Sequence, residues 1–151
     1  MYRSPSHHEF AGTTGGQFQE EFVGSCRLAM WRGEYVKYAV AMNMARMNQP
    51  KDALHQTGVR LRDLIAQKIG VSSDAVKFFT ALGTPLDHWH GVDAFIETTA
   101  FPGVTVTVDF TLSAKAGYKA RVIVSQEDVL TDFSNAVDAI VSAFRRPPLR
   151  A

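Results

Sequence analysis

Apolar residues recur every three or four positions in the first half of the chain, which is the spacing of one face of an amphipathic helix. The pattern runs from Phe18 to Met47, with two glycine interruptions, and is clearest in EYVKYAVAMNMARM. A second helix is predicted over 51–70, where Gly70 stands in the C-cap position. A shorter third helix is predicted over 72–83.

The pattern changes to alternating apolar and polar residues in the second half, as is typical of β-strands. Two strands are predicted over 91–99 and 103–114, joined by a Pro-Gly turn, and a third over 118–126. A helix over 125–146 closes the chain, with acidic residues early and arginines late, as the helix dipole favours. The prediction is an α/β (α+β) fold: helices first, then a three-stranded, largely antiparallel meander and a C-terminal helix.

Length and composition indicate an ordinary globular protein. Of the 151 residues, 1–17 are predicted to form a flexible arm and 18–151 a single domain. A net charge of +1 argues against a protein that coats nucleic acid, although it leaves room for a local basic site. The single cysteine, Cys26, excludes an internal disulfide, and no apolar stretch approaches the roughly 20 residues that span a bilayer. We therefore expect a cytoplasmic location and no membrane partner.

Acidic residues within the predicted strands are the main functional signal. In VTVTVDFTLSA, Asp109 shares its strand face with threonines and a serine, while valines, Phe and Leu form the other face. In the preceding strand, Asp93 and Glu97 also share one face. If the two strands pair across the turn, all three carboxylates could lie together, although the sequence does not define the register.

Clustered carboxylates of this kind hold Mg²⁺ or Mn²⁺ in many proteins, usually together with waters. Such a cation can activate water and neutralise the charge that builds up on a phosphate. Lys115 and Lys119, just beyond the second acidic strand, could add a positive group to the site. The alternative is a solvated sheet face whose charges serve only solubility, and spacing alone favours that alternative.

At these residues the chain resembles the PD-(D/E)XK nuclease superfamily, over roughly residues 30–146. GVDAF resembles the first motif, with Asp93 as a metal ligand, and TVDFT resembles the second, with Asp109 as its acid. WRGEYVKYAVAMNMAR resembles the helix that often carries a glutamate before the strands, here Glu34. The resemblance implies a restriction-endonuclease-like core and Mg²⁺-dependent hydrolysis of phosphodiester bonds in nucleic acid, with DNA as the expected partner.

The chain departs from that pattern at one position. Thr111 stands two residues after Asp109, where the motif lysine belongs. In some members of the superfamily the lysine moves to a neighbouring element, and Lys115 and Lys119 are the candidates; Lys115 has the same strand parity as Asp109. If neither reaches the site, the alternative is a non-cleaving binding module on a similar scaffold, which could form a homodimer through its Met- and aromatic-rich helices.

Two histidines precede the first predicted strand in LDHWHG. His88 and His90 could bind zinc with Asp87 or Asp93 as a further ligand, or one could act as a general base. The simpler interpretation, which we favour, is a loop in which Trp89 packs onto the core and the histidines face water.

Overall fold

The computed structural model describes residues 15–26, 33–112 and 120–147. The elements in chain order are α1 Gly15–Glu20, α2 Tyr38–Met47, α3 Gln56–Ile69, the short 3₁₀ helix η2 Ser73–Ala75, β1 Val76–Thr80, α4 Pro85–His90, β2 Ala94–Thr98, β3 Val106–Thr111, β4 Val122–Ser125, α5 Gln126–Leu130 and α6 Ser134–Arg145.

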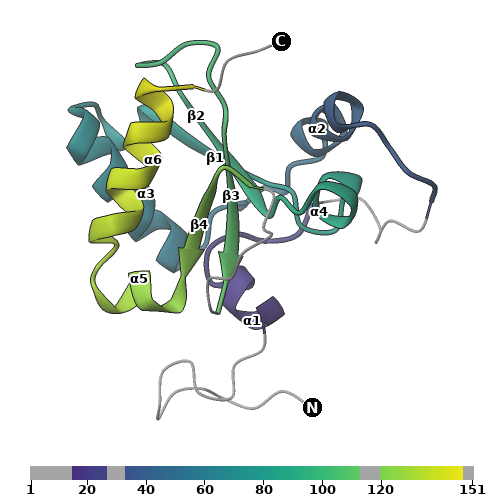
Figure 1. Ribbon diagram of the computed structural model, residues 1–151, viewed down its shortest axis with the longest axis horizontal. Coiled ribbons are helices and arrows are strands. Elements are labelled where there is room, and N and C mark those ends of the chain that lie inside the picture. The colour runs from purple at the N-terminus through teal and green to yellow at the C-terminus, as the bar shows by residue number, and fades with distance from the viewer. Residues whose placement is uncertain (1–14, 27–32, 113–119, 148–151) are drawn as a thin grey trace.

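The four strands form one mixed sheet in the order β1-β2-β3-β4 (Figure 1). The first three strands are an antiparallel meander, and β4 runs parallel to β3. The predicted α/β class is therefore confirmed. The predicted strand count is wrong, because the meander begins one strand earlier than expected and a parallel strand follows it.

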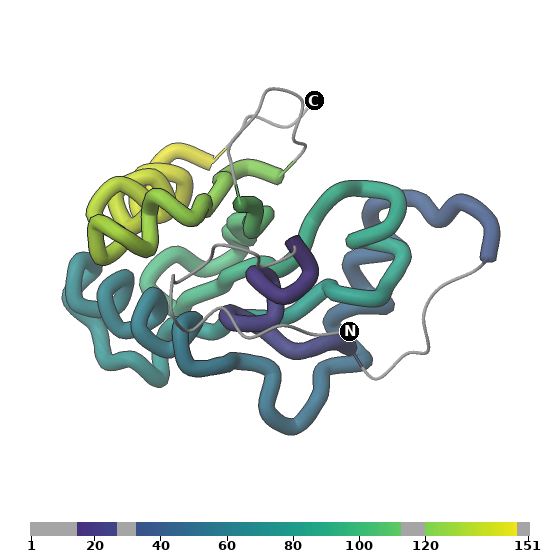
Figure 2. The backbone as a smooth tube through the Cα atoms, turned by 90° about the horizontal axis from the view of Figure 1, so that it is seen from below, coloured from purple at the N-terminus to yellow at the C-terminus, as the bar shows by residue number. Residues whose placement is uncertain are grey.

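One face of the sheet packs against α3 and α6, which lie side by side in Figures 1 and 2, and Phe18 of α1 enters the same core. Phe22, just after α1, stacks on Phe110 of β3 with ring centroids 4.1 Å apart. Val106, Val108 and Phe110 all enter this core. The strand parity predicted from the alternation is thus confirmed.

The other face of the sheet is covered by α2 and α4 over β1 and β2 (Figure 1). Phe79 and Phe95 stack there at 4.9 Å between ring centroids. The helix side chains that pack with them include Ala41, Met42 and Leu86. Helices therefore flank the sheet on both faces, and polar residues on this second face can be buried.

The helix predicted over 72–83 is wrong, because most of it is β1. Val76, Phe78 and Thr80 are buried and alternate with the exposed Lys77. Phe79 is partly buried on the second face, so β1 is apolar on both sides and lacks the simple alternation of a surface strand. A short apolar run of this kind does not distinguish a strand from a helix by periodicity.

The prediction of a loop around His88 is also wrong, because these residues form α4. The Thr84 side chain caps the helix by accepting a hydrogen bond from the Leu86 N–H, and Pro85 occupies the first turn. Gly91 ends the helix with a φ of 66°, a left-handed conformation that glycine adopts without strain.

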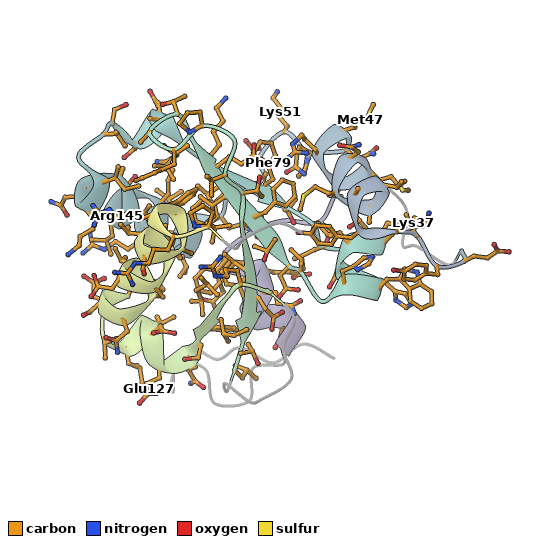
Figure 3. All side chains as sticks on the ribbon, turned by 45° about the horizontal axis from the view of Figure 1, so that its top comes forward. Lys37, Met47, Lys51, Phe79, Glu127 and Arg145 are labelled. Atoms are coloured by element: carbon orange, nitrogen blue, oxygen red, sulfur yellow. The ribbon has the colours of Figure 1, made fainter. Side chains whose placement is uncertain are left out.

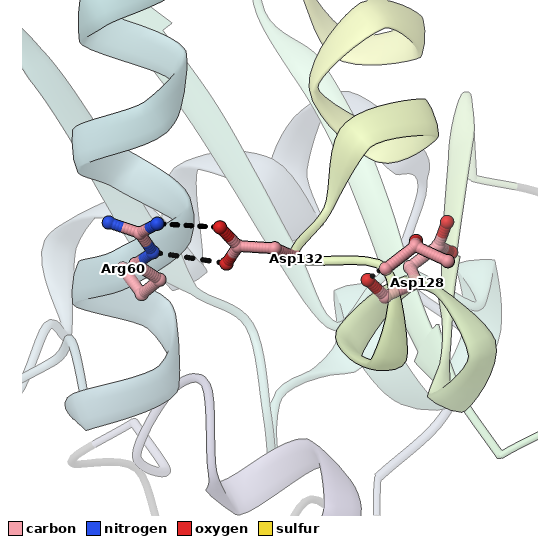
Figure 4. Close-up of polar contacts among 4 residues, drawn as sticks. Arg60, Asp128 and Asp132 are labelled. Atoms are coloured by element: carbon pink, nitrogen blue, oxygen red, sulfur yellow. Dashed lines mark hydrogen bonds and ion pairs between the residues drawn. The ribbon is translucent and has the colours of Figure 1, made fainter.

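Both ends of the domain also differ from the prediction. Helix α1 begins inside the predicted flexible arm, and its Phe18 is fully buried. The C-terminal helix is interrupted between α5 and α6, where Asp132 and Phe133 adopt φ values of 54° and 66°. Asp132 accepts two hydrogen bonds from Arg60 of α3, and Asp128 caps the start of α5 (Figure 4).

Gln49 links α2 to the free edge of β1. Its side-chain oxygen accepts a hydrogen bond from the Thr80 N–H at 2.9 Å, and its Nε2 lies 2.8 Å from the Thr80 carbonyl and 2.7 Å from the Ala45 carbonyl. The amide thus pairs with the edge as a neighbouring strand would, and it fixes α2 above the sheet.

We expect Gln49→Ala to lower the free energy of unfolding by about 1–3 kcal/mol, because it leaves the N–H of the buried Thr80 without its acceptor and removes one donor from the Thr80 carbonyl. Urea unfolding measures this loss. Gln67→Ala, at an exposed position of α3, is the matched control and should change stability little. Equal stability of the two variants would show that the Gln49 contacts contribute nothing.

Candidate active site

A break in the β2–β3 ladder positions the first carboxylate of the site. The last paired residues are Ala94 and Val108, and the same register would set Asp93 opposite Asp109. Instead, the Asp93 N–H donates to the Val108 carbonyl at 3.0 Å, and Asp93 Oδ2 accepts from the Phe110 N–H at 2.8 Å. The carboxylate therefore takes the place of a backbone acceptor, which holds it against β3.

Asp93 and Asp109 meet as a buried, hydrogen-bonded pair. Asp93 is 1% exposed and Asp109 is 7% exposed. Burial, together with the hydrogen bond to Asp109 and the charge of Asp109, raises the pKa of Asp93 to about 10. Burial also raises the pKa of Asp109, while its hydrogen bond from Asp93 lowers it. At neutral pH, Asp93 is thus the protonated partner that donates to the Asp109 carboxylate.

A third carboxylate, Asp87 of α4, adjoins this pair. Its Oδ2 accepts from the Gly83 N–H at 3.2 Å, and it also hydrogen-bonds to Asp93. Burial raises the pKa of Asp87, and the nearby charge of Asp109 adds to the shift. We call Asp87, Asp93 and Asp109 the carboxylate triad.

The triad adjoins a cavity of about 360 Å³ through Asp87. The cavity lies between α1 and the start of α4, and its lining residues are Gly16, Gln19, Glu20, Ser25, Leu82, Gly83, Thr84, Asp87 and His88. Asp93 and Asp109 are buried and do not line the cavity, so the half-buried Asp87 is the member of the triad that a molecule in the cavity would contact.

Glu97 is not part of the triad. It lies on β2, four residues after Asp93, and its carboxylate forms an ion pair with Arg46 of α2 and accepts from the Thr105 hydroxyl at 2.6 Å. The Arg46 guanidinium also lies over the Phe95 ring, 5.3 Å from its centroid. These contacts explain the acid at this position as the partner of an arginine.

The remaining predicted residues lie elsewhere. Glu34 is exposed in a bend before α2, which begins only at Tyr38, so it is not on the helix that the resemblance implied. Lys115 and Lys119 lie outside the described residues.

The two histidines have separate surroundings. His88 is exposed and lines the cavity, whereas His90 Nε2 lies 2.8 Å from the Val36 carbonyl, to which it donates. Cys26 is buried with its thiol 3.1 Å from the Thr80 carbonyl, and burial together with the Asp87 charge raises its pKa to about 11. A thiol of this kind is a poor nucleophile at neutral pH.

Within 15–26, 33–112 and 120–147, no three or more His, Cys, Asp or Glu side chains are arranged to hold a metal ion. The triad does supply two carboxyl groups in direct contact. Mg²⁺ is often bound through only one or two carboxylates, with waters and substrate oxygens completing its shell. The donor set therefore fits a partly hydrated divalent cation that takes the place of the shared proton.

Sequence reasoning did not place Asp87 in a cluster with the strand acids. The helix that carries Asp87 could have been recognised from the sequence TPLDHWHG, whose Thr-Pro start and final glycine are typical of a short capped helix. Even with that helix recognised, its position over β2 is a tertiary property.

No family model, no curated protein and no solved structure matches this chain. Among the residues that the structure describes, no helix is long and apolar enough to cross a membrane.

The pKa of Asp93 predicts how stability varies with pH. In the unfolded chain the pKa of an aspartate is about 3.9. Between that pH and about pH 10, the folded protein therefore retains a proton on Asp93 that the unfolded chain releases. The Asp93 contribution to stability is therefore fully present below the unfolded pKa and is lost as pH rises toward the folded value.

We expect Asp93→Asn to flatten this dependence and to be more stable than the wild type in mildly alkaline buffer. The amide can still accept from the Phe110 N–H and donate to Asp109, but it carries no charge. Urea unfolding between about pH 5 and 9 measures the slope. Asp74→Asn, at an exposed position, is the control and should keep the wild-type slope. An unchanged slope in Asp93→Asn would contradict the assigned protonation.

Proposed function

We propose that the carboxylate triad binds Mg²⁺ or Mn²⁺ and that the protein hydrolyses phosphodiester bonds of nucleic acid, with DNA as the expected substrate. One observation carries the proposal: the carboxyl groups of Asp93, just before β2, and of Asp109 on β3 are buried in hydrogen-bond contact. A divalent cation in place of the proton that they share would relieve the repulsion between two buried carboxylates.

Each member of the triad has a role in this proposal. Asp93 and Asp109 hold the cation, and the Phe110 N–H keeps the Asp93 carboxylate oriented toward it. Asp87, at the cavity wall, binds a water of the hydrated ion. The cation, when bound, supplies an activated water and neutralises the charge that develops on the phosphate. The motif resemblance of GVDAF and TVDFT supports this assignment.

The second candidate is a non-catalytic module on a similar scaffold. It is favoured by Thr111, which occupies the position of the motif lysine. In that case the triad is a structural cluster that keeps its proton. The two candidates differ in cation binding, in cleavage, and in the dependence of both on Asp109.

Binding of Mn²⁺ should release about one proton per ion near neutral pH, because the ion displaces the proton of Asp93. The affinity should therefore rise with pH. Calorimetry in buffers of different ionisation enthalpy measures both quantities. Asp109→Asn should lose binding, and Asp74→Asn should retain it. Binding that is independent of pH and of Asp109 would locate the ion elsewhere.

Cleavage of single- and double-stranded DNA and of RNA should require Mg²⁺ or Mn²⁺. We expect Asp109→Ala to reduce the rate about a hundredfold or more. Lys115→Ala and Lys119→Ala, tested separately, should show which lysine replaces the one missing at Thr111. An ion that binds at the triad without any cleavage would support the non-catalytic module.

A further inference from the structure

A second cavity lies at the other end of β2 from the carboxylate triad. Its volume is about 520 Å³, within the range of about 300–1,000 Å³ that is usual for small-molecule sites. Asp93 precedes β2 and Glu97 lies near its end, so roughly 13 Å of extended chain separates the triad from this cavity. Among the described residues, the two cavities have no lining residue in common. The second cavity is therefore a separate candidate site.

The floor of this cavity is a row of side chains that crosses the sheet. Lys77 of β1 stands directly opposite Glu97 of β2, and Glu97 accepts a hydrogen bond from the hydroxyl of Thr105, just before β3. Phe79, on the same face of β1 as Lys77, lies between the sheet and α2 in Figure 3. The row is therefore on the face that α2 covers, next to the last turn of that helix, where Arg46 pairs with Glu97.

The charges on the floor do not balance. Oε2 of Glu97 already accepts from both Arg46 and Thr105. Lys77 is exposed, and within 15–26, 33–112 and 120–147 no carboxylate lies within ion-pair distance of its ammonium group. Two cationic side chains thus share one carboxylate. This leaves a surplus positive charge at the floor, which an anionic ligand would neutralise.

Arg46 is held in position before any ligand arrives. Its guanidinium lies over the rings of Phe79 and Phe95, 5.8 Å and 5.3 Å from their centroids. A guanidinium has five N–H donors, and the hydrogen bond to Glu97 occupies one of them. The side chain is 36% exposed, so donors remain for an acceptor in the cavity. A donor that is already immobilised loses little entropy on binding, which favours affinity.

The walls of the cavity are largely apolar. Ala75 of η2 contributes one wall, and Pro102 and Val104, from the turn between β2 and β3, contribute another. Apolar walls with a few convergent polar groups are the usual composition of a small-molecule site. The burial of an apolar body between these walls would add to the affinity of an anion bound at the floor.

We propose that this cavity binds a small organic anion that consists of an apolar, ring-sized body and one carboxylate. The carboxylate binds between Arg46 and Lys77, and the body lies between Ala75 and Val104. The exposed Asp74 also lines the cavity and would repel a second anionic group, which restricts the ligand to a single negative charge. The site does not depend on the function proposed for the triad.

Titration of the isotope-labelled full chain with cinnamate, followed by NMR in the presence of a chelator, tests the proposal. We expect a dissociation constant on the order of 1 mM, as for other ligands with about a dozen non-hydrogen atoms. The amide signals of Thr99 and Gly103 should shift, while that of Gly83 in the triad cavity should not. The neutral cinnamamide should bind at least about threefold more weakly, and the cation cinnamylamine more weakly still.

Three variants test the charges. Lys77→Gln should weaken cinnamate binding at least about threefold and leave cinnamamide unaffected. Asp74→Asn should strengthen cinnamate binding, because it removes a repulsive charge. Lys37→Gln, which replaces an exposed lysine before α2, is the matched control and should change neither affinity. All three positions are exposed, so the variants should unfold at the wild-type urea concentration.

Three results would overturn the proposal. The first is equal affinity for cinnamate and cinnamamide, which would remove the role of the charge. The second is a shift at Gly83 in place of Thr99 and Gly103, which would locate the ligand in the triad cavity. The third is the absence of any shift up to about 20 mM cinnamate. A failure of metal binding or cleavage at the triad would leave these expectations unchanged.

Discussion

The hydrogen bond from the Phe110 N–H to the Asp93 carboxylate connects the main parts of this domain. It lies where β2 leaves the ladder with β3, and the Asp93 carbonyl accepts from the Ala81 N–H beyond β1. Phe110 stacks on Phe22 in the core beneath the sheet, while Val92, next to Asp93, packs in the core under α2 and α4. A change at this acid would therefore affect both cores and the triad together.

Burial of Asp93 beside Asp109 opposes folding, because two negative charges lose their hydration and repel each other, unless a proton or a cation offsets the charge. A proton shared by the two carboxyl groups removes one of the negative charges, and it makes the stability of the protein depend on pH. A divalent cation bound between them would also offset the charge, and it could act on phosphate groups. Acids in contact and out of water are costly in a purely structural sheet, which is why the triad is the strongest indication of function in this molecule.

Helix α2 contributes to the molecule on two sides. Inward, Arg46 pairs with Glu97, and Gln49, just after the helix, pairs with the edge of β1. These polar contacts hold the helix in one orientation over Phe79 and Phe95. Because that orientation is fixed, the outward residues of α2 also keep a defined position relative to the sheet.

The sequence by itself determined the features that depend on local periodicity. The alternation in β3 correctly assigned the inward valines and the opposite face of Asp109, because side chains of a strand alternate with a period of two. Val92, expected on the face of Ala94 and Ile96, packs instead with Phe95 because it lies before β2 begins. The features that depend on contacts across the fold came only with the tertiary structure. Helices cover both faces of the sheet, so β1 is apolar on both sides and its sequence resembles that of a helix. Asp109 is buried, although the alternation of residues placed it on a polar strand face. The register that joins Asp93 to Asp109, the approach of Asp87 from α4, and the pairing of Glu97 with an arginine 51 residues earlier are long-range contacts, and no local pattern specifies them.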